Sequence, residues 1–136
     1  SCIGVVVYDP IAHVGGMLHA MLPTSTTDVE RAKTNPEMFV DTGVPLLFRS
    51  CYAEGAQKER LQVRLYGGSC TNAPENDMFQ IGRRNLVMVR KLLWKNGVLL
   101  QEEETGGSAS RTVSLEIGTG TVAIKSTNRT EGAVPR

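Results

Sequence analysis

A cysteine and a histidine near the start of the chain are of the residue types needed for nucleophilic attack on a carbonyl group. Cys2 precedes an apolar run over residues 3–7, and His19 lies in a second stretch over residues 14–22. Asp9-Pro10 separates the two stretches, which predicts a tight hairpin of two antiparallel strands. Such pairing would bring Cys2 close to His19, so that the imidazole could take the thiol proton and the thiolate could attack.

The same two residues also have an ordinary structural interpretation. A cysteine at the head of an apolar strand is commonly a small buried hydrophobe, and a single histidine is commonly a structural residue. The pair Gly15-Gly16 favours a close backbone approach or an unusual turn ahead of the second strand. Spacing by itself therefore leaves both interpretations open.

Two helices are expected from the periodicity of the apolar residues. Residues at helical spacing between Val40 and Cys51 predict a first helix, in which Cys51 belongs to the core. Pro45 fits this helix only if the helix begins within one turn of it. A second helix is expected over residues 81–96, with Asn96-Gly97 as its C-terminal stop.

Strands are expected where apolar residues alternate with polar ones. One strand runs over residues 61–65, ahead of a glycine turn, and another over residues 98–102. Residues 113–117 and 122–124 predict an antiparallel hairpin around the turn at residues 118–120. Including the strands of the first hairpin, roughly seven strands and two helices are expected. This combination fits an α/β sandwich with mixed sheets.

Composition narrows the class of protein. The 136 residues suffice for one domain, and 15 basic against 14 acidic residues leave a formal charge of +1, which offers no argument for nucleic acid or membrane partners. No apolar run is long enough to span a bilayer. The cysteines Cys2, Cys51 and Cys70 favour free thiols in a reducing, cytoplasmic compartment, with Cys70 after a turn and open to oxidation. No C-x-x-C or H-x-x-x-H spacing occurs, so neither zinc nor any other cofactor is expected.

A series of short motifs runs in order from residue 1 to residue 125. They are Ser1-Cys2-Ile3, Gly15-Gly16-Met17-x-His19-x-Met21-Leu22-Pro23, Phe39-Val40-Asp41 with Val44-Pro45-Leu46-Leu47, Leu65-Tyr66-Gly67-Gly68-Ser69, Ile81-Gly82-Arg83-Arg84-Asn85 with Val89-Arg90 and Leu93, Gly106-Gly107 with Arg111, and Thr119-Gly120 with Val122 and Lys125. In this order they resemble the CheD family, the bacterial chemoreceptor glutamine deamidases. One departure is Ser110, which stands where the family has glycine before the arginine.

The resemblance implies both a fold and an activity. The fold is a layered α/β/β sandwich, shared with the cytotoxic necrotising factor deamidases, over residues 1–125, and residues 126–136 form a polar tail. The activity is hydrolysis of a receptor glutamine to glutamate and ammonia, with Cys2 as nucleophile and His19 as base. The family also has a catalytic threonine shortly before its cysteine. That position falls ahead of Ser1, in an N-terminal part missing from this chain, so we expect low activity without it.

The implied partners are the cytoplasmic helices of chemoreceptors as substrate and a CheC-type phosphatase. An alternative from a different class is a chemotaxis binding module that engages such a phosphatase, which acts on phosphorylated CheY, with little catalysis of its own. A third alternative is a thiol hydrolase of the same fold that acts on small amides. Reactivity of Cys2 toward an alkylating reagent would favour an enzyme over a binding module.

Overall fold

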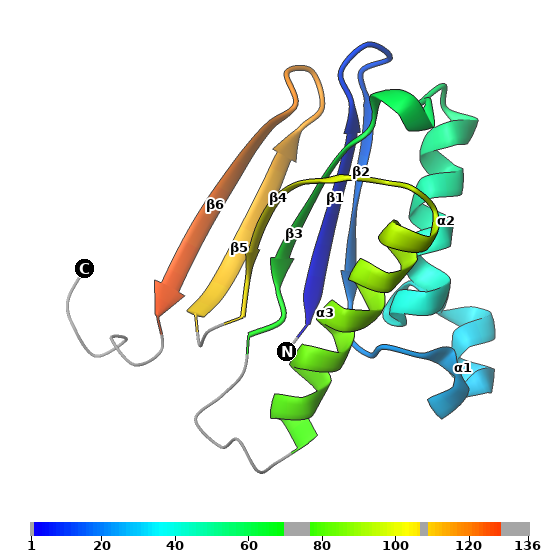
Figure 1. The fold of residues 1–136 in the computed structure, drawn as a ribbon, viewed down its shortest axis with the longest axis vertical. Helices are drawn as coiled ribbons and strands as arrows, with labels where there is room; N and C mark the ends of the chain where they lie inside the picture. Colours follow the sequence, from blue (N-terminus) through cyan, green and yellow to red (C-terminus); the bar gives the residue numbers. More distant parts are fainter. Residues whose placement is uncertain (1, 70–76, 107–108, 129–136) are drawn as a thin grey trace.

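Two sheets and two long helices form the fold of the residues described, which are 2–69, 77–106 and 109–128 of a computed structural model (Figure 1). The strands are β1 (Ile3–Asp9), β2 (Val14–Ala20), β3 (Gln62–Gly67), β4 (Leu100–Thr105), β5 (Ala109–Glu116) and β6 (Thr121–Asn128). The helices are α1 (Val29–Thr34), α2 (Val40–Ala53) and α3 (Asp77–Lys95). The first four strands form one sheet in the order β2-β1-β3-β4, and β5 and β6 form a separate ribbon.

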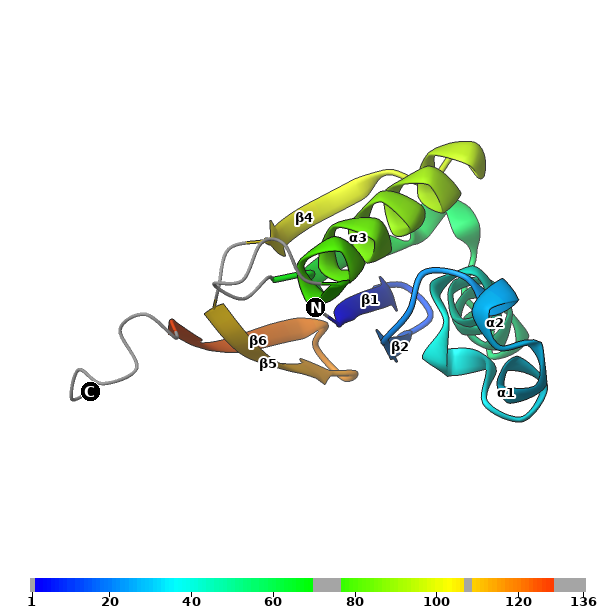
Figure 2. The ribbon, with the colours of Figure 1, turned by 90° about the horizontal axis from the view of Figure 1, so that it is seen from below.

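The elements are arranged in three layers. Seen from below, α2 and α3 lie on one side of β1 and the β5–β6 ribbon lies on the other (Figure 2). The main core joins the helices to the four-stranded sheet, and its best-buried members include Ile3, Val5, Val63, Leu65 and Val89. Because β1 pairs antiparallel with β2 and β3, whereas β3 pairs parallel with β4, the sheet is mixed. The predicted α/β/β sandwich with mixed sheets is therefore confirmed.

The first hairpin has the predicted pairing. Ile3 is opposite Ala20 and Gly4 is opposite His19 in the antiparallel register of β1 and β2. Ile3, Val5 and Val7 point into the core under the helices. Since side chains alternate along a strand, Gly4 and its neighbours at even positions face the β5–β6 ribbon.

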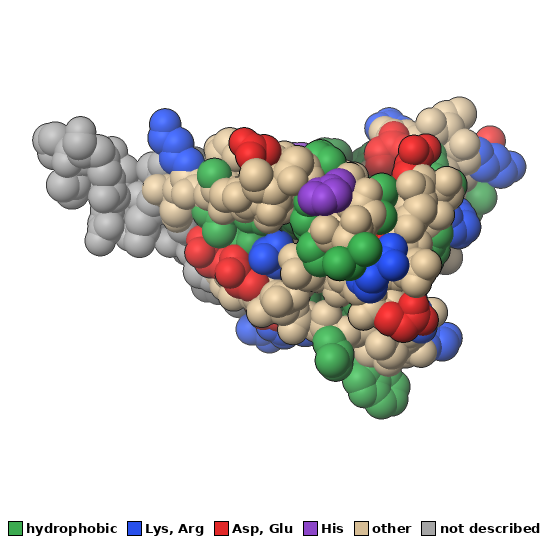
Figure 3. Space-filling model, turned by 90° about the horizontal axis from the view of Figure 1, so that it is seen from above, with side chains coloured by type: hydrophobic (Ala, Val, Ile, Leu, Met, Phe, Trp, Pro, Cys, Tyr) green, Lys and Arg blue, Asp and Glu red, His purple; other side chains and the backbone are tan. Residues whose placement is uncertain are grey.

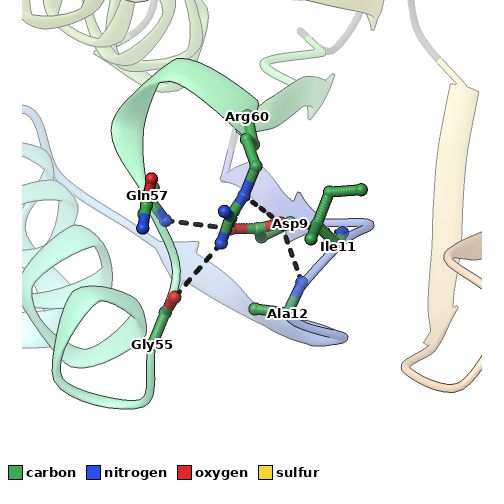
Figure 4. A network of polar contacts seen from close by, with 6 residues as sticks. All are labelled: Asp9, Ile11, Ala12, Gly55, Gln57 and Arg60. Atoms are coloured by element: carbon green, nitrogen blue, oxygen red, sulfur yellow. Dashed lines mark hydrogen bonds and ion pairs between the residues drawn. The ribbon is translucent and has the colours of Figure 1, made fainter.

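The far end of β1 is held by the carboxylate of Asp9, which is fully buried (Figure 4). Arg60 forms an ion pair with this carboxylate, with Nη2 2.8 Å from Oδ2, and its Nε also donates to both oxygens. The backbone N–H groups of Ile11, Ala12 and Gln57 donate to it as well. The Arg60 hydrogen bond, and then these backbone donors, lower the pKa of Asp9 well below its usual range, although burial opposes them.

The position of Pro45 differs from the prediction. Helix α2 begins at Val40, directly after the extended residue Phe39, so that Pro45 lies in the interior of the helix and beyond its first turn. The requirement that the helix begin within one turn of the proline is wrong here. Proline deprives the Asp41 carbonyl of its helical donor, but the buried face of α2, which includes Val44 and Leu47, offsets this loss by packing on the sheet.

The C-terminal end of α3 explains why strand β4 starts later than predicted. Gly97 adopts φ +70, its N–H bonds the Trp94 carbonyl, and the Val98 N–H bonds the Leu93 carbonyl. This pair of bonds closes the helix, so Val98 belongs to the cap and not to the strand predicted over residues 98–102. Strand β4 starts at Leu100 instead.

Other predictions fall partly outside the described residues. Strand β6 continues to Asn128, so the predicted tail over residues 126–136 begins within that strand. The remainder of the tail and Cys70 lie outside the described residues. No helix in the described ranges combines the length and the apolar character needed to cross a membrane. On the face at the hairpin end of β1 and β2, acidic and basic side chains are interspersed (Figure 3).

Candidate active site

Cys2 and His19 lie on the same face of the four-stranded sheet. His19 is directly opposite Gly4, and opposite residues of an antiparallel pair project to the same side. Cys2 is two residues from Gly4 along the chain, immediately before β1, and therefore continues the same alternation. The structure thus brings together the two residues that the sequence singled out.

The two side chains share a cleft of about 500 Å³ between the sheet and the start of β5. Its lining residues are Cys2, Gly4, Met17, Leu18, His19, Tyr66, Gly67, Ser69, Arg111, Thr112 and Val113. A pocket of this size is typical of small-ligand sites and can admit a single side chain of another protein.

The residues of β1 that face the ribbon explain why the cleft lies at the N-terminal end of this strand. They are Tyr8, Val6 and Gly4, so the side chains become smaller toward Cys2. Tyr8 and Val6 are buried, and the Tyr8 hydroxyl donates to the Ile117 carbonyl at 2.6 Å. Gly4 has no side chain, and a Cβ built there would lie 3.6 Å or more from its neighbours. The space beside Cys2 and His19 is therefore left open by a glycine.

The side chains of the candidate pair have no competing hydrogen bond within the part of the chain that the structure describes. Cys2 is a free, partly exposed cysteine, and His19 is exposed. Neither the Cys2 thiol nor the His19 ring has a hydrogen bond to any residue that the structure describes. Catalytic hydrogen bonds often form only when a substrate is bound. Both groups are thus accessible from the cleft and available for proton transfer.

The backbone of Cys2, in contrast, is held closely by the end of β3. The Gly68 N–H donates to the Cys2 carbonyl at 2.7 Å. Gly67 adopts φ +99, and a Cβ built there would lie 2.5 Å from the Cys2 oxygen. Only glycine can occupy such a position without displacing Cys2.

Helix α3 supports this end of the sheet from the other side. A Cβ on Gly82 would lie 2.8 Å from the Ser69 carbonyl oxygen and 3.0 Å from that of Gly68, so the helix approaches the chain closely there. Asn85, fully buried on the same helix, donates from Nδ2 to the Met21 carbonyl at 3.1 Å. Helix α3 therefore holds both the segment that follows β3, next to Cys2, and the segment that follows β2, next to His19.

Tyr66 lines the cleft but its hydroxyl is already engaged. It is buried and donates to Glu102 Oε2 at 2.7 Å. Burial, and then the hydrogen bond to Glu102, raise the pKa of Tyr66 above its ordinary value. Tyr66 consequently stays protonated and serves as a wall of the cleft.

The remaining cysteine and histidine of the described chain lie away from this cleft. Cys51 is buried in the main core, as predicted, and burial raises the pKa of its thiol. His13 lies at the turn of the first hairpin with φ 56, and its Nδ1 is 3.2 Å from the Tyr8 hydroxyl oxygen. Within the described ranges, no three His, Cys, Asp or Glu side chains gather closely enough to hold a metal ion.

Sequence reasoning missed Arg111, Ser69 and Thr112 as members of the cleft. One signal was available for Arg111, because it alternates in phase with Val113 and Leu115, the inward-facing apolar residues of β5. A charged residue in phase with an apolar face must have partners inside the protein.

The cleft and its residues can be compared with known proteins. A family model described as CheD chemotactic sensory transduction matches residues 21–126. The match covers most of the chain but begins after His19, so it does not include the two candidate catalytic residues.

Relatives over nearly the whole chain carry related names. A Syntrophus aciditrophicus protein, "Probable chemoreceptor glutamine deamidase CheD 1", is 52% identical over 93% of this chain and 78% of its own length. "Probable chemoreceptor glutamine deamidase CheD" of Solibacter usitatus is 47% identical over 99% of this chain and 79% of its own length. A protein of the same name from Thermococcus kodakarensis is 39% identical over 92% of this chain and 77% of its own length.

Proposed function

This chain belongs to the CheD family, and on that premise we propose that it is a chemoreceptor glutamine deamidase with Cys2 as nucleophile and His19 as general base. The observation that carries the assignment of these residues is their position on one face of the sheet, lining one cleft, with side chains that make no hydrogen bond to a described residue. The wall of that cleft contains no other cysteine or histidine among the described residues.

The first half of the reaction forms a thioester and releases ammonia. His19 takes the thiol proton of Cys2, and the thiolate sulfur bonds to the side-chain carbonyl carbon of a protein glutamine. The carbonyl oxygen becomes negatively charged, and our candidate donor for it is the backbone N–H of Cys2. His19 then returns the proton to the amide nitrogen, the carbon–nitrogen bond breaks, and ammonia leaves.

The second half hydrolyses the thioester. His19 takes a proton from a water molecule, and the hydroxide oxygen attacks the same carbon. The carbon–sulfur bond breaks, glutamate is formed, and the thiol of Cys2 regains its proton. The rigid hold on the Cys2 backbone supports this role, because a fixed main chain keeps the sulfur in register with the base through both halves.

The substrate must place its glutamine in an open cleft. The cytoplasmic helices of a receptor can do so because a glutamine on an exposed helical face projects away from the backbone. Each turnover replaces a neutral amide by a carboxylate on that helix. A glutamyl methyl ester has its carbonyl in the same place, so we expect slow ester hydrolysis as a side reaction.

The cellular location follows from the same proposal, whereas the second partner does not. Acting on receptor cytoplasmic helices requires the enzyme to be in the cytoplasm. Binding of a CheC-type phosphatase stays a prediction from the family resemblance. Co-purification of the two proteins, with and without Cys2→Ala, would test whether that binding is independent of catalysis.

The test is a mass-spectrometric deamidation assay on receptor cytoplasmic fragments. Cys2→Ala should lower the rate about a thousandfold or more, as loss of a nucleophile does in other hydrolases, and leave the melting temperature unchanged. Cys51→Ala is the matched control, since Cys51 is buried in the core and distant from the cleft. Undiminished activity in a folded Cys2→Ala protein would contradict the assignment.

A further inference from the structure

Arg111 joins three strands at the rim of the cleft. Its side chain is only 9% exposed, and its Nε lies 3.2 Å from Glu104 Oε2 on β4. Its Nη2 donates to the Gly106 carbonyl at 3.1 Å, and its Nη1 donates to the Gly67 carbonyl at 3.4 Å. One guanidinium on β5 therefore contacts the ends of β3 and β4 as well as the cleft.

The Gly67 carbonyl is the link between Arg111 and Cys2. It accepts from the Gly106 N–H at 2.8 Å as well as from Arg111. The Gly67 carbonyl and the Gly68 N–H belong to the same peptide unit, which is planar and rigid. That N–H donates to the Cys2 carbonyl at 2.7 Å. Fixing the carbonyl on one side of the peptide therefore fixes the donor to Cys2 on the other side.

The charge on Arg111 adds to this geometric effect. A carbonyl that accepts from a cation is polarised, and the N–H of the same peptide becomes a stronger donor. Gly67 and Gly68 both have positive φ and lack side chains. Glycine has a wide range of backbone conformations, so the two residues by themselves do not restrict the orientation of the peptide between them. The contacts from Gly106 and Arg111 constrain its carbonyl side, in addition to the pairing of Gly67 with Ile3 and the close approach of α3 at Gly82.

We propose that Arg111 is a positioning residue that holds Cys2 in register with His19 through the Gly67–Gly68 peptide. The inference rests on the proposed function, in which Cys2 and His19 are the reacting pair. Three of its five N–H groups donate to Glu104 and to two backbone carbonyls, so the role proposed for Arg111 acts through the protein.

Two substitutions separate this role from others. Arg111→Met keeps most of the side-chain length and removes every donor, whereas Arg111→Lys keeps the charge near Glu104 but loses the fork that reaches two carbonyls. Displacing Cys2 from its base should lower kcat about tenfold to hundredfold in Arg111→Met and leave KM nearly unchanged. Arg111→Lys should be intermediate. Arg49→Met is the matched control, because Arg49 is exposed on α2 and distant from the cleft.

A second readout does not depend on the receptor substrate. Iodoacetamide is small, and its reaction with Cys2, followed by peptide mass mapping near neutral pH, reports how well the thiol is activated. We expect the rate for Cys2 to fall in Arg111→Met by a factor similar to the fall in kcat, and to be intermediate in Arg111→Lys.

The outcomes distinguish the alternatives. Unchanged kcat and alkylation per folded molecule, with only a lower melting temperature, would mean that Arg111 is merely structural and would overturn the proposal. A raised KM with unchanged alkylation would make Arg111 a substrate-binding residue and would also overturn it. If the unsubstituted protein alkylates fast at Cys2 but deamidates no receptor fragment, the proposed function fails while the alkylation data still test Arg111.

Discussion

The two ends of strand β1 use polar groups in opposite ways. At the C-terminal end, Asp9 is fully buried and its carboxylate accepts hydrogen bonds from Arg60 and from three backbone N–H groups. At the N-terminal end, Cys2 and His19 are at least partly exposed and their side chains have no hydrogen bond to a described residue. Six residues of one strand, 3–8, separate the fully hydrogen-bonded carboxylate of Asp9 from the Cys2 side chain.

The difference shows how one strand can serve both stability and chemistry. A buried charge stabilises a fold only when its hydrogen-bonding capacity is filled, and Asp9 meets that condition. The proposed nucleophile and base must remain able to bond a substrate, and their side chains make no hydrogen bond to a residue that the structure describes. The backbone at both ends is fixed, by the Asp9 turn at one and by the Gly67–Gly68 peptide at the other.

The largest expected effect comes from Asp9→Asn. The substitution removes the negative charge opposite Arg60 and leaves that cation beside a neutral, buried amide. Breaking a buried pair in this way should lower the free energy of unfolding by about 3 kcal/mol or more. Urea unfolding measures the loss. The deamidation rate per folded molecule should change little, and a rate loss beyond the unfolded fraction would contradict the separation of the two ends.

The pH dependence of the same variant sharpens this test. The pKa of Asp9 is lower in the folded state than in the unfolded chain, where it is about 3.8. Its contribution is therefore fully present above that unfolded value and is lost as the pH falls through the folded pKa. The stability difference between the unsubstituted protein and Asp9→Asn should thus be constant near neutral pH and shrink in strong acid. Glu30→Gln, which breaks the exposed pair with Lys33, should show no such difference.

His19→Ala should have the next largest effect, and this effect should be on activity instead of stability. Loss of the general base is expected to lower the deamidation rate about a hundredfold. Stability should stay nearly constant, because the His19 ring is exposed. His13→Asn is the control, since asparagine tolerates the positive φ at that turn and His13 lies far from the cleft. A larger rate loss from the His13 variant than from His19→Ala would refute the assignment of the base.

Gly4→Ala should give the smallest effect, again confined to activity. The backbone has room for the methyl group, whose nearest neighbours would lie 3.6 Å or more away. The group would nevertheless occupy the floor of the cleft, beside His19 on the same face. We expect a loss of about tenfold in kcat/KM with little change in melting temperature. Gly118→Ala, in open space, should alter neither quantity.

Local sequence was enough to place Cys2 beside His19. A short turn after Asp9 fixes which residues of the hairpin face each other, and alternation fixes which side they share. The stop of α3 was equally local, because Gly97 has the positive φ that glycine readily adopts at a helix end. The core face of α2 followed from its helical spacing, although Pro45 made the helix start harder to predict.

Contacts between distant segments decided the rest of the candidate site. The Gly68 bond to Cys2, the Asn85 bond to Met21 and the Arg111 bonds to Gly67 and Gly106 each depend on how the layers pack. The periodicity of the sequence does not predict these contacts. They join segments that come close only when the sheet, the helix and the ribbon have packed together. The sequence by itself predicted the candidate pair, Cys2 and His19. The tertiary structure decided that a cleft opens beside it and that Arg111 holds its backbone, since both require the β5–β6 ribbon to lie against the sheet where Gly4 leaves space.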